Sequence, residues 1–164
     1  MQTKGSYIIS FLLLVVVQVL LLNNLHLFGV QAYLYVMFII TFPISVSSKI
    51  LMPISFLLGL CVDVFSGTYG VHAAATTFAA FVRPLLLRLI VPVNDATQIE
   101  SLSLSKQKLN FVGFAVVMVL LHHFALLMLE AFSFKHIGVV AVKTLLSSVY
   151  TLLLMFCLFL FQKK

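Results

Sequence analysis

The chain alternates long apolar runs with short polar breaks. A bilayer core about 30 Å thick is crossed by roughly 20 apolar residues in helix, and six runs approach this length. They cover residues 6–22, 30–46, 50–65, 71–91, 111–132 and 137–161. This pattern predicts an all-α, polytopic membrane protein whose six transmembrane helices form one bundle and a single domain over residues 1–164.

Most of the polar breaks are only a few residues long. Residues 66–70, Ser-Gly-Thr-Tyr-Gly, are typical of a tight turn because glycine adopts backbone conformations that other residues avoid. The exception is 92–110, which holds two acidic and two basic residues. We expect it to form one long cytoplasmic loop.

The composition and the placement of charges predict how the six apolar runs are oriented in the membrane. Hydrophobic residues make up 63% of the chain and charged residues 9%, which excludes a water-soluble core. The net charge of +6 reflects lysines and arginines at the ends of apolar runs, a pattern of membrane orientation and not of nucleic-acid binding. If the N-terminus is inside, all ten lysines and arginines except Lys135 and Lys143 lie on or near the cytoplasmic side. We therefore predict a multi-pass membrane protein with both termini in the cytoplasm and the turns at Asn23 and Gly67 outside.

Two charged residues are expected just inside the outer interface. Asp63 precedes Gly67 by about one helical turn, and Lys143 lies roughly two turns into the last run. They could form an intramembrane ion pair, which would offset the desolvation of each. In the alternative, Lys143 extends outward and Asp63 caps the Gly67 turn.

Small residues recur on one face of the third run, where Ser55, Gly59 and Asp63 are spaced by four. The fourth run has a similar stripe at Ala75 and Ala79. Small faces let helices approach closely in lipid, so the pattern favours a packed hairpin of these two helices.

Other ionisable residues within the runs are candidate contact sites, because burying a charge in the bilayer is costly. Arg83 is deep enough to need a protein partner or a hydrated groove, whereas Arg88 is close enough to the end to contact lipid phosphates. Glu130 lies seven residues after His123 and on roughly the same face, which suggests either a proton relay or histidines that are neutral and hydrogen-bonded in the bundle. His122 points elsewhere, because adjacent helical residues diverge by about 100°.

No catalytic constellation is recognisable. The sequence has no serine elbow, no HExxH and no glycine-rich phosphate loop. Cys61 and Cys157 lie far apart in apolar runs and suggest neither a disulfide framework nor a metal site. We expect no enzyme activity, no cofactor and no metal.

The stretch 55–81, SFLLGLCVDVFSGTYGVHAAATTFAAF, resembles the rod shape-determining protein MreD family. The family pattern is a glycine, a short apolar run, Asp, two apolar residues, Ser-Gly, and then a glycine that opens a helix of small residues. The matching positions here, together with Ser55 at the start of the stretch, are Gly59, Asp63, Ser66, Gly67, Gly70 and His72. The last two runs match the family by hydropathy only.

This resemblance implies a scaffold subunit of the bacterial cell-elongation complex, or elongasome, which lies in the inner membrane and directs peptidoglycan synthesis. Its partner would be the single-span protein MreC and, indirectly, MreB filaments and RodA-type synthases. The family fold is similar to that of the substrate-binding subunits of energy-coupling-factor transporters. The resemblance therefore also implies an alternative, a solute-binding subunit of an uptake transporter. A pocket opening outward near Asp63 is expected in either case.

Overall fold

A computed structural model describes residues 4–27, 29–90 and 108–161, and within these ranges the chain is helical and contains no strand. Five of the helices are long and apolar enough to cross a membrane, which confirms the all-α membrane class. The elements are α1 (Lys4–Leu20), η1 (Leu22–Asn24), α2 (Val36–Thr41), α3 (Ser48–Ser66), α4 (Val71–Ile90), α6 (Lys108–Ala131), η2 (Phe134–His136) and α7 (Ile137–Phe161). The predicted loop 92–110 lies largely outside the described residues.

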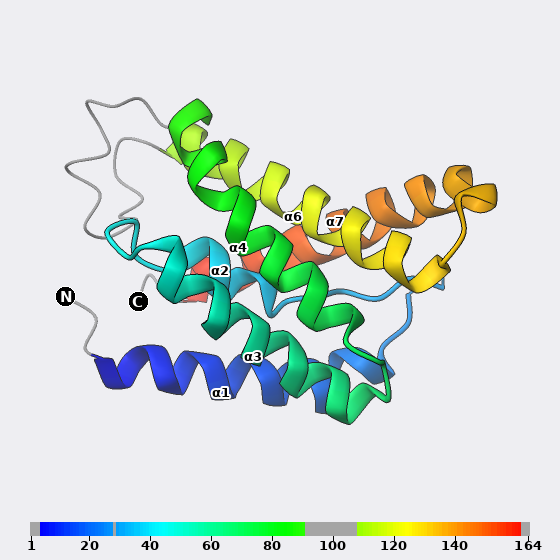
Figure 1. Ribbon diagram of the computed structural model, residues 1–164, viewed down its shortest axis with the longest axis horizontal. Helices are drawn as coiled ribbons and strands as arrows, with labels where there is room; N and C mark the ends of the chain where they lie inside the picture. Colours follow the sequence, from blue (N-terminus) through cyan, green and yellow to red (C-terminus); the bar gives the residue numbers. More distant parts are fainter. Residues whose placement is uncertain (1–3, 28, 91–107, 162–164) are drawn as a thin grey trace.

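The long helices run back and forth between two ends of one bundle (Figure 1). One end, the terminal end, holds the starts of α1, α3 and α6 and the final turns of α4 and α7. The opposite end, the turn end, holds η1, the α3–α4 turn and η2. The described ends of the first and last helices therefore share one side of the bundle, as expected for an even number of crossings. Which compartment that side faces stays a prediction.

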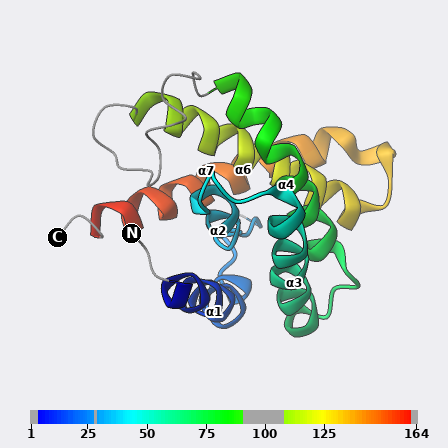
Figure 2. The same cartoon turned by 60° about the vertical axis from the view of Figure 1, so that its left-hand side comes forward.

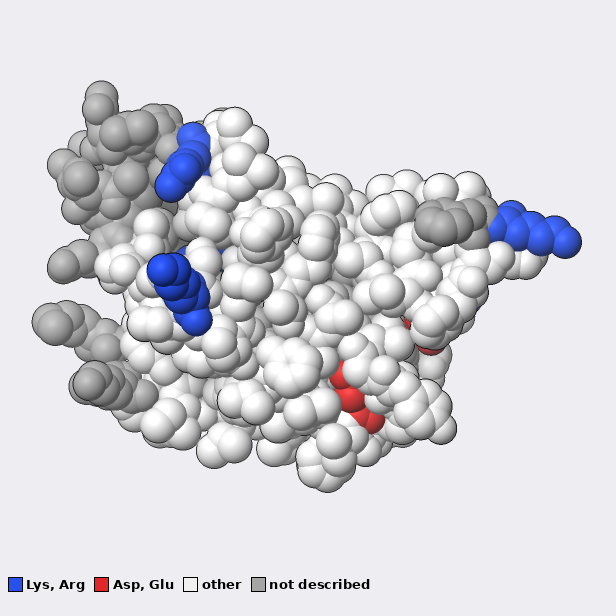
Figure 3. Space-filling model, in the orientation of Figure 1, with Lys and Arg blue, Asp and Glu red and all other residues white. Residues whose placement is uncertain are grey.

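Charged side chains follow this division. On the face seen in Figure 3, lysine and arginine side chains lie at the two ends, and the surface between them carries none. Lys49 and Arg88 are exposed at the terminal end, and Lys135 is exposed at the turn end. Between their ends the helices carry many exposed apolar side chains, such as Leu57, Phe78 and Leu153, which is the arrangement a bilayer requires.

The second predicted helix, 30–46, is wrong in its extent. The helix in this region is α2, which has only six residues and follows a non-helical stretch from 29 to 35. Residues 32–40 are all buried, and the other helices surround this segment in both ribbon views (Figure 2). We call residues 25–46 the interrupted crossing, because the chain passes from the turn end to the terminal end within it. Non-helical backbone at membrane depth is tolerated only where protein or water satisfies its polar groups.

Side chains of the neighbouring helices supply the missing hydrogen bonds. The Gln18 amide on α1 donates through Nε2 to the carbonyl of Ala32 at 3.0 Å and accepts through Oε1 from the N–H of Leu34 at 2.9 Å. On α7, Thr151 Oγ1 accepts from the N–H of Tyr33 at 3.0 Å. Three consecutive residues of the interrupted crossing are therefore bound from opposite sides, in the manner of a strand between two partners.

Two further contacts hold this segment. Ser147, one turn before Thr151, donates from its hydroxyl to the carbonyl of Gln31. Arg83 on α4 donates to the carbonyl of Phe42, the residue that ends α2. A cation at a helix C-terminus is favourable because unsatisfied carbonyls gather there.

The hydrogen bonds of Gln18 can be tested by removing them. Replacing Gln18 with leucine keeps the bulk but leaves two buried backbone groups without partners. Because each such group costs about 1–3 kcal/mol, we expect Gln18→Leu to lower the free energy of unfolding by at least about 2 kcal/mol, measured by circular dichroism during titration into a denaturing detergent. Asn24→Leu is the control, since the Asn24 amide is exposed and bonds only the carbonyl of Leu20. Equal stability of Gln18→Leu and the wild type would contradict this account of the crossing.

Candidate functional site

The residues that match the family pattern meet at the junction of α3 and α4, which lies at the turn end. Gly67 ends α3 in the left-handed conformation, with φ of 68°, and its N–H donates to the carbonyl of Asp63. Gly70 precedes α4 with φ of 83°. Both positions favour glycine because a side chain is strained there. The hydroxyl of Ser66 accepts from the side-chain amide of Asn23 at 2.7 Å and so ties η1 to this turn.

Asp63 is the polar centre of the junction and is only 2% exposed. Its Oδ1 accepts from the Thr68 hydroxyl at 2.6 Å and from the N–H of His72 at 3.0 Å. Its Oδ2 accepts from the N–H of Ala73 at 2.8 Å. The carboxylate thus caps the first turn of α4, where free N–H groups and the helix dipole stabilise negative charge.

The predicted ion pair of Asp63 and Lys143 is not formed. The Asp63 carboxylate bonds only groups of the junction, whereas Lys143 is exposed and lines a pocket on the other side of the bundle core. Capping by Asp63, the alternative, matches the geometry. The Asp63 carboxylate accepts hydrogen bonds from the first turn of α4 as well as from the α3–α4 turn. These three hydrogen bonds stabilise the buried negative charge, so no cation is needed beside it.

The small face of α3 allows a very close contact with α4. A Cβ atom added to Gly59 would lie 2.5 Å from the Ala73 Cα, from the His72 carbonyl oxygen and from the Thr76 hydroxyl. Two of these are backbone atoms that cannot rotate away. Ser55, one turn earlier, is fully buried. The small residues at these positions therefore set the distance between the two helices.

His72 connects this hairpin to the interrupted crossing. Its ring is 6% exposed, and Nδ1 lies 2.7 Å from the hydroxyl of Tyr35, in hydrogen-bonding contact. The ring of Tyr33 lies 5.7 Å from the same imidazole. The backbone N–H of His72 is thus bound by the Asp63 carboxylate, and its ring is bound by the hydroxyl of Tyr35.

His122 and His123 of α6 are both fully buried. The Nε2 atom of His123 lies 2.9 Å from the hydroxyl of Thr151, and the His122 ring lies 5.3 Å from that of Tyr35. Glu130 forms no hydrogen bond with either histidine. It is exposed and lines the pocket with Lys143. For His123 the structure therefore favours a hydrogen-bonded histidine over the proton relay, which was the other alternative.

The two arginines of α4 have different environments. Arg83 is 3% exposed and donates to the Phe42 carbonyl of the same chain, so its partner in this structure lies within the fold, and the expected contact with a further protein partner or a hydrated groove stays a prediction. Arg88 is exposed near the terminal end, and its lipid contact stays a prediction.

Sequence reasoning missed the polar partners of the interrupted crossing. Gln18 was visible as the one strongly polar side chain inside the first apolar run, but nothing local indicates what it binds. Ser147 and Thr151, spaced by four, form a hydroxyl stripe on α7. A glutamine and such a stripe on flanking runs could have signalled that the second crossing needs side-chain partners.

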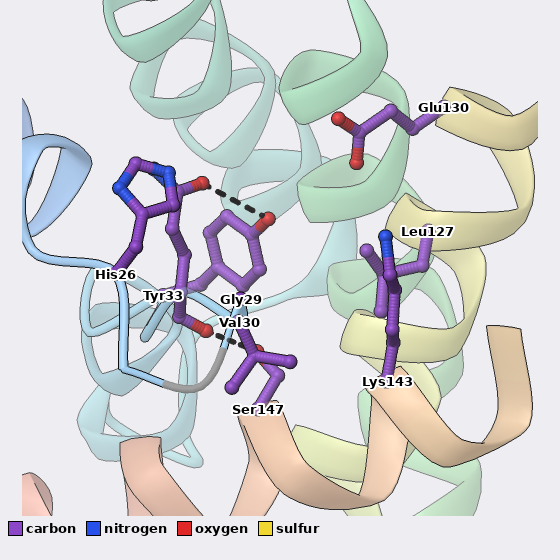
Figure 4. Close-up of a pocket in the computed structure, with 9 residues that line it drawn as sticks. His26, Gly29, Val30, Tyr33, Leu127, Glu130, Lys143 and Ser147 are labelled. Carbon is purple, nitrogen blue, oxygen red and sulfur yellow. Dashed lines mark hydrogen bonds between the residues drawn. The ribbon is translucent and has the colours of Figure 1, made fainter. Parts of the chain in front are cut away.

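A pocket of about 130 Å³ opens beside the interrupted crossing (Figure 4). It lies between His26 and residues 29–33 on one side and the helices α6 and α7 on the other, at the turn end. Its lining comprises His26, Gly29, Val30, Gln31, Tyr33, Leu127, Glu130, Lys143 and Ser147. An outward pocket was expected near Asp63. The pocket found lies at the same end of the bundle, but Asp63 does not line it.

Because of the close contact at Gly59, we expect a glycine-to-alanine substitution to affect stability differently at Gly59 and at Gly138. Gly59→Ala places a methyl group against backbone atoms of α4, so we expect a loss of about 1–3 kcal/mol in unfolding free energy. Gly138→Ala on α7 meets nothing within 4 Å and should be neutral or slightly stabilising. Detergent-induced unfolding of the two purified variants measures both. The packing interpretation fails if Gly59→Ala is as stable as Gly138→Ala.

Comparison with known proteins adds no assignment. No family model matches the chain, and neither curated proteins nor solved structures give a significant match. The likeness to the MreD family and the fold likeness to transporter subunits therefore rest on the sequence pattern alone.

Proposed function

We propose that this chain is a membrane subunit of the bacterial cell-elongation complex, of the MreD type, and that it works by association with partners and not by catalysis. One observation carries the proposal. The residues that resemble the family, spread over Gly59 to His72 in sequence, act together as a single structural unit in which each has a packing or capping role.

A rigid hairpin suits a scaffold because a binding surface that is already ordered loses little entropy on association. The tip of the hairpin is stiffened by the Asp63 cap and by the glycine turn. It carries Tyr69 with its side chain fully exposed, and Val64 and Phe65 are exposed on the adjoining turn of α3. Aromatic and apolar side chains on a fixed backbone are effective anchors for a partner.

The partner proposed for this surface is a single-span protein of the MreC type, through which MreB filaments and RodA-type synthases would be reached. In this assignment the chain lies in the cytoplasmic membrane with its termini inside. The turn end then faces the compartment in which the cell wall is made. Asp63, Arg83 and His123 support a non-enzymatic role, since each is engaged in a hydrogen bond that holds the fold together.

A second candidate function is a solute-binding subunit of an uptake transporter. The pocket at the turn end favours it, because transporter sites commonly form where a membrane-crossing segment is non-helical, and the interrupted crossing lines this pocket. It remains second because the family resemblance lies in the hairpin and not in the pocket.

Depletion of the protein in its rod-shaped host tests the first proposal. We expect depleted cells to become round, and we expect the tagged chain, purified from native membranes, to bring with it a single-span coiled-coil protein. Tyr69→Ala should reduce the recovery of that partner, because the exposed anchor is lost while the fold is left intact. Quantitative mass spectrometry of the purified complex measures this recovery.

Phe156→Ala serves as the matched control, since Phe156 is an exposed aromatic on α7, away from the hairpin. Its partner recovery should equal that of the wild type. Unchanged cell shape on depletion would contradict the scaffold proposal. Recovery of ATPase subunits in place of the coiled-coil protein would support the transporter alternative.

A further inference from the structure

The pocket at the turn end contains two opposite charges that serve no structural purpose apparent in the fold. Glu130 comes just before the last residue of α6, and Lys143 lies about 9 Å along α7 from its first residue. Both line the pocket and both are exposed. They are close to the end of the bundle, at the depth where headgroups and water meet a bilayer.

The two charged side chains form no hydrogen bond with each other. Figure 4 draws the hydrogen bonds among the lining residues, and none joins Glu130 to Lys143. Both charged side chains stand on the α6 and α7 side of the pocket, opposite His26 and Tyr33. A carboxylate and an ammonium that line one cavity without pairing can each bind an oppositely charged group of a ligand.

The opposite wall of the pocket is fixed. The carbonyl of Gln31 accepts from Ser147, and the side-chain oxygen of Gln31 accepts from the Tyr33 hydroxyl at 3.4 Å. Lys143 lies one helical turn before Ser147 on α7, so the same helix face that binds the interrupted crossing also presents the ammonium. The part of α7 that carries Lys143 is thereby held against Gln31 of the interrupted crossing.

We infer that this pocket binds a small zwitterion, whose anionic oxygens would contact Lys143 and whose ammonium would contact Glu130. A volume of about 130 Å³ accommodates a group of the size of an amino acid or of phosphoethanolamine. Both present an N–H-bearing ammonium and an anionic group a few atoms apart. One is a free solute, and the other is the headgroup of phosphatidylethanolamine, which can reach a pocket at the end of the helices from the bilayer.

The inference goes beyond the scaffold function and does not depend on it. It also gives the transporter alternative a ligand class. The test uses purified full-length protein without any partner, so its outcome is independent of the cell-shape experiment.

The experiment places the protein in phosphatidylglycerol nanodiscs and applies two probes. Native mass spectrometry measures the retention of phosphatidylethanolamine mixed into the bilayer, and equilibrium dialysis measures the binding of radiolabelled L-alanine. We expect one probe to bind, and we expect its affinity to fall about tenfold or more in Glu130→Gln and also in Lys143→Gln, because each loses a charge-assisted hydrogen bond. The probe that binds identifies the source of the zwitterion.

Lys135→Gln is the matched control. Lys135 is an exposed lysine at the same end of the bundle but outside the pocket, so its removal should leave binding unchanged. Phosphatidylcholine, whose quaternary ammonium donates no N–H hydrogen bond, should not replace phosphatidylethanolamine. Failure of both probes to bind, or loss of binding in only one of the two pocket variants, would overturn the inference. Thermal unfolding of each variant establishes that the fold is retained, as expected for exposed side chains.

Discussion

The fold depends on one constraint, which is that the backbone polar groups of the interrupted crossing must find partners inside the protein. A continuous helix would satisfy these groups within itself, but residues 29–35 are not helical. In hydrocarbon each unsatisfied group is costly. Gln18 from α1 and Thr151 from α7 meet this need from two sides, and Arg83 closes the far end of α2. Three separate helices are therefore held around the same segment by hydrogen bonds, and apolar contacts alone would not specify that arrangement.

Three further polar residues inside the crossings have the same role, which is to form hydrogen bonds between separate parts of the chain. Asp63 supplies the start of α4 with acceptors, His72 binds Tyr35, and His123 binds Thr151. Each is an ionisable or polar group that a bilayer would penalise if it were alone, and each has a partner on another part of the chain. Among the described residues Glu130 and Lys143 form no such hydrogen bond and line one pocket together, which is why this pocket stands out as a place for a ligand.

The sequence predicted the features that depend on local pattern. Apolar length predicted five helices that the structure confirms, and the Gly67 turn predicted the α3–α4 hairpin. It failed where the outcome depends on contacts between distant residues. The run 30–46 is as apolar as its neighbours, so hydropathy alone predicts a full helix there. The partners that stabilise its non-helical half, Gln18 and Thr151, lie on the first and last helices. Asp63 and Lys143 similarly share a depth along their helices, but position around the bundle cannot be read from depth.

The central structural claim is that specific side chains replace the missing helical hydrogen bonds of the second crossing. Amide hydrogen exchange at Tyr33 and Leu34, followed by NMR on the protein in nanodiscs, tests it most directly. Both amides should be protected although neither belongs to a helix. Thr151→Val should release the amide of Tyr33 while leaving that of Leu34 slow, and Gln18→Leu should do the reverse, because each amide has a different partner. Rapid exchange at both amides in the wild type, or equal release of both in either variant, would contradict the account.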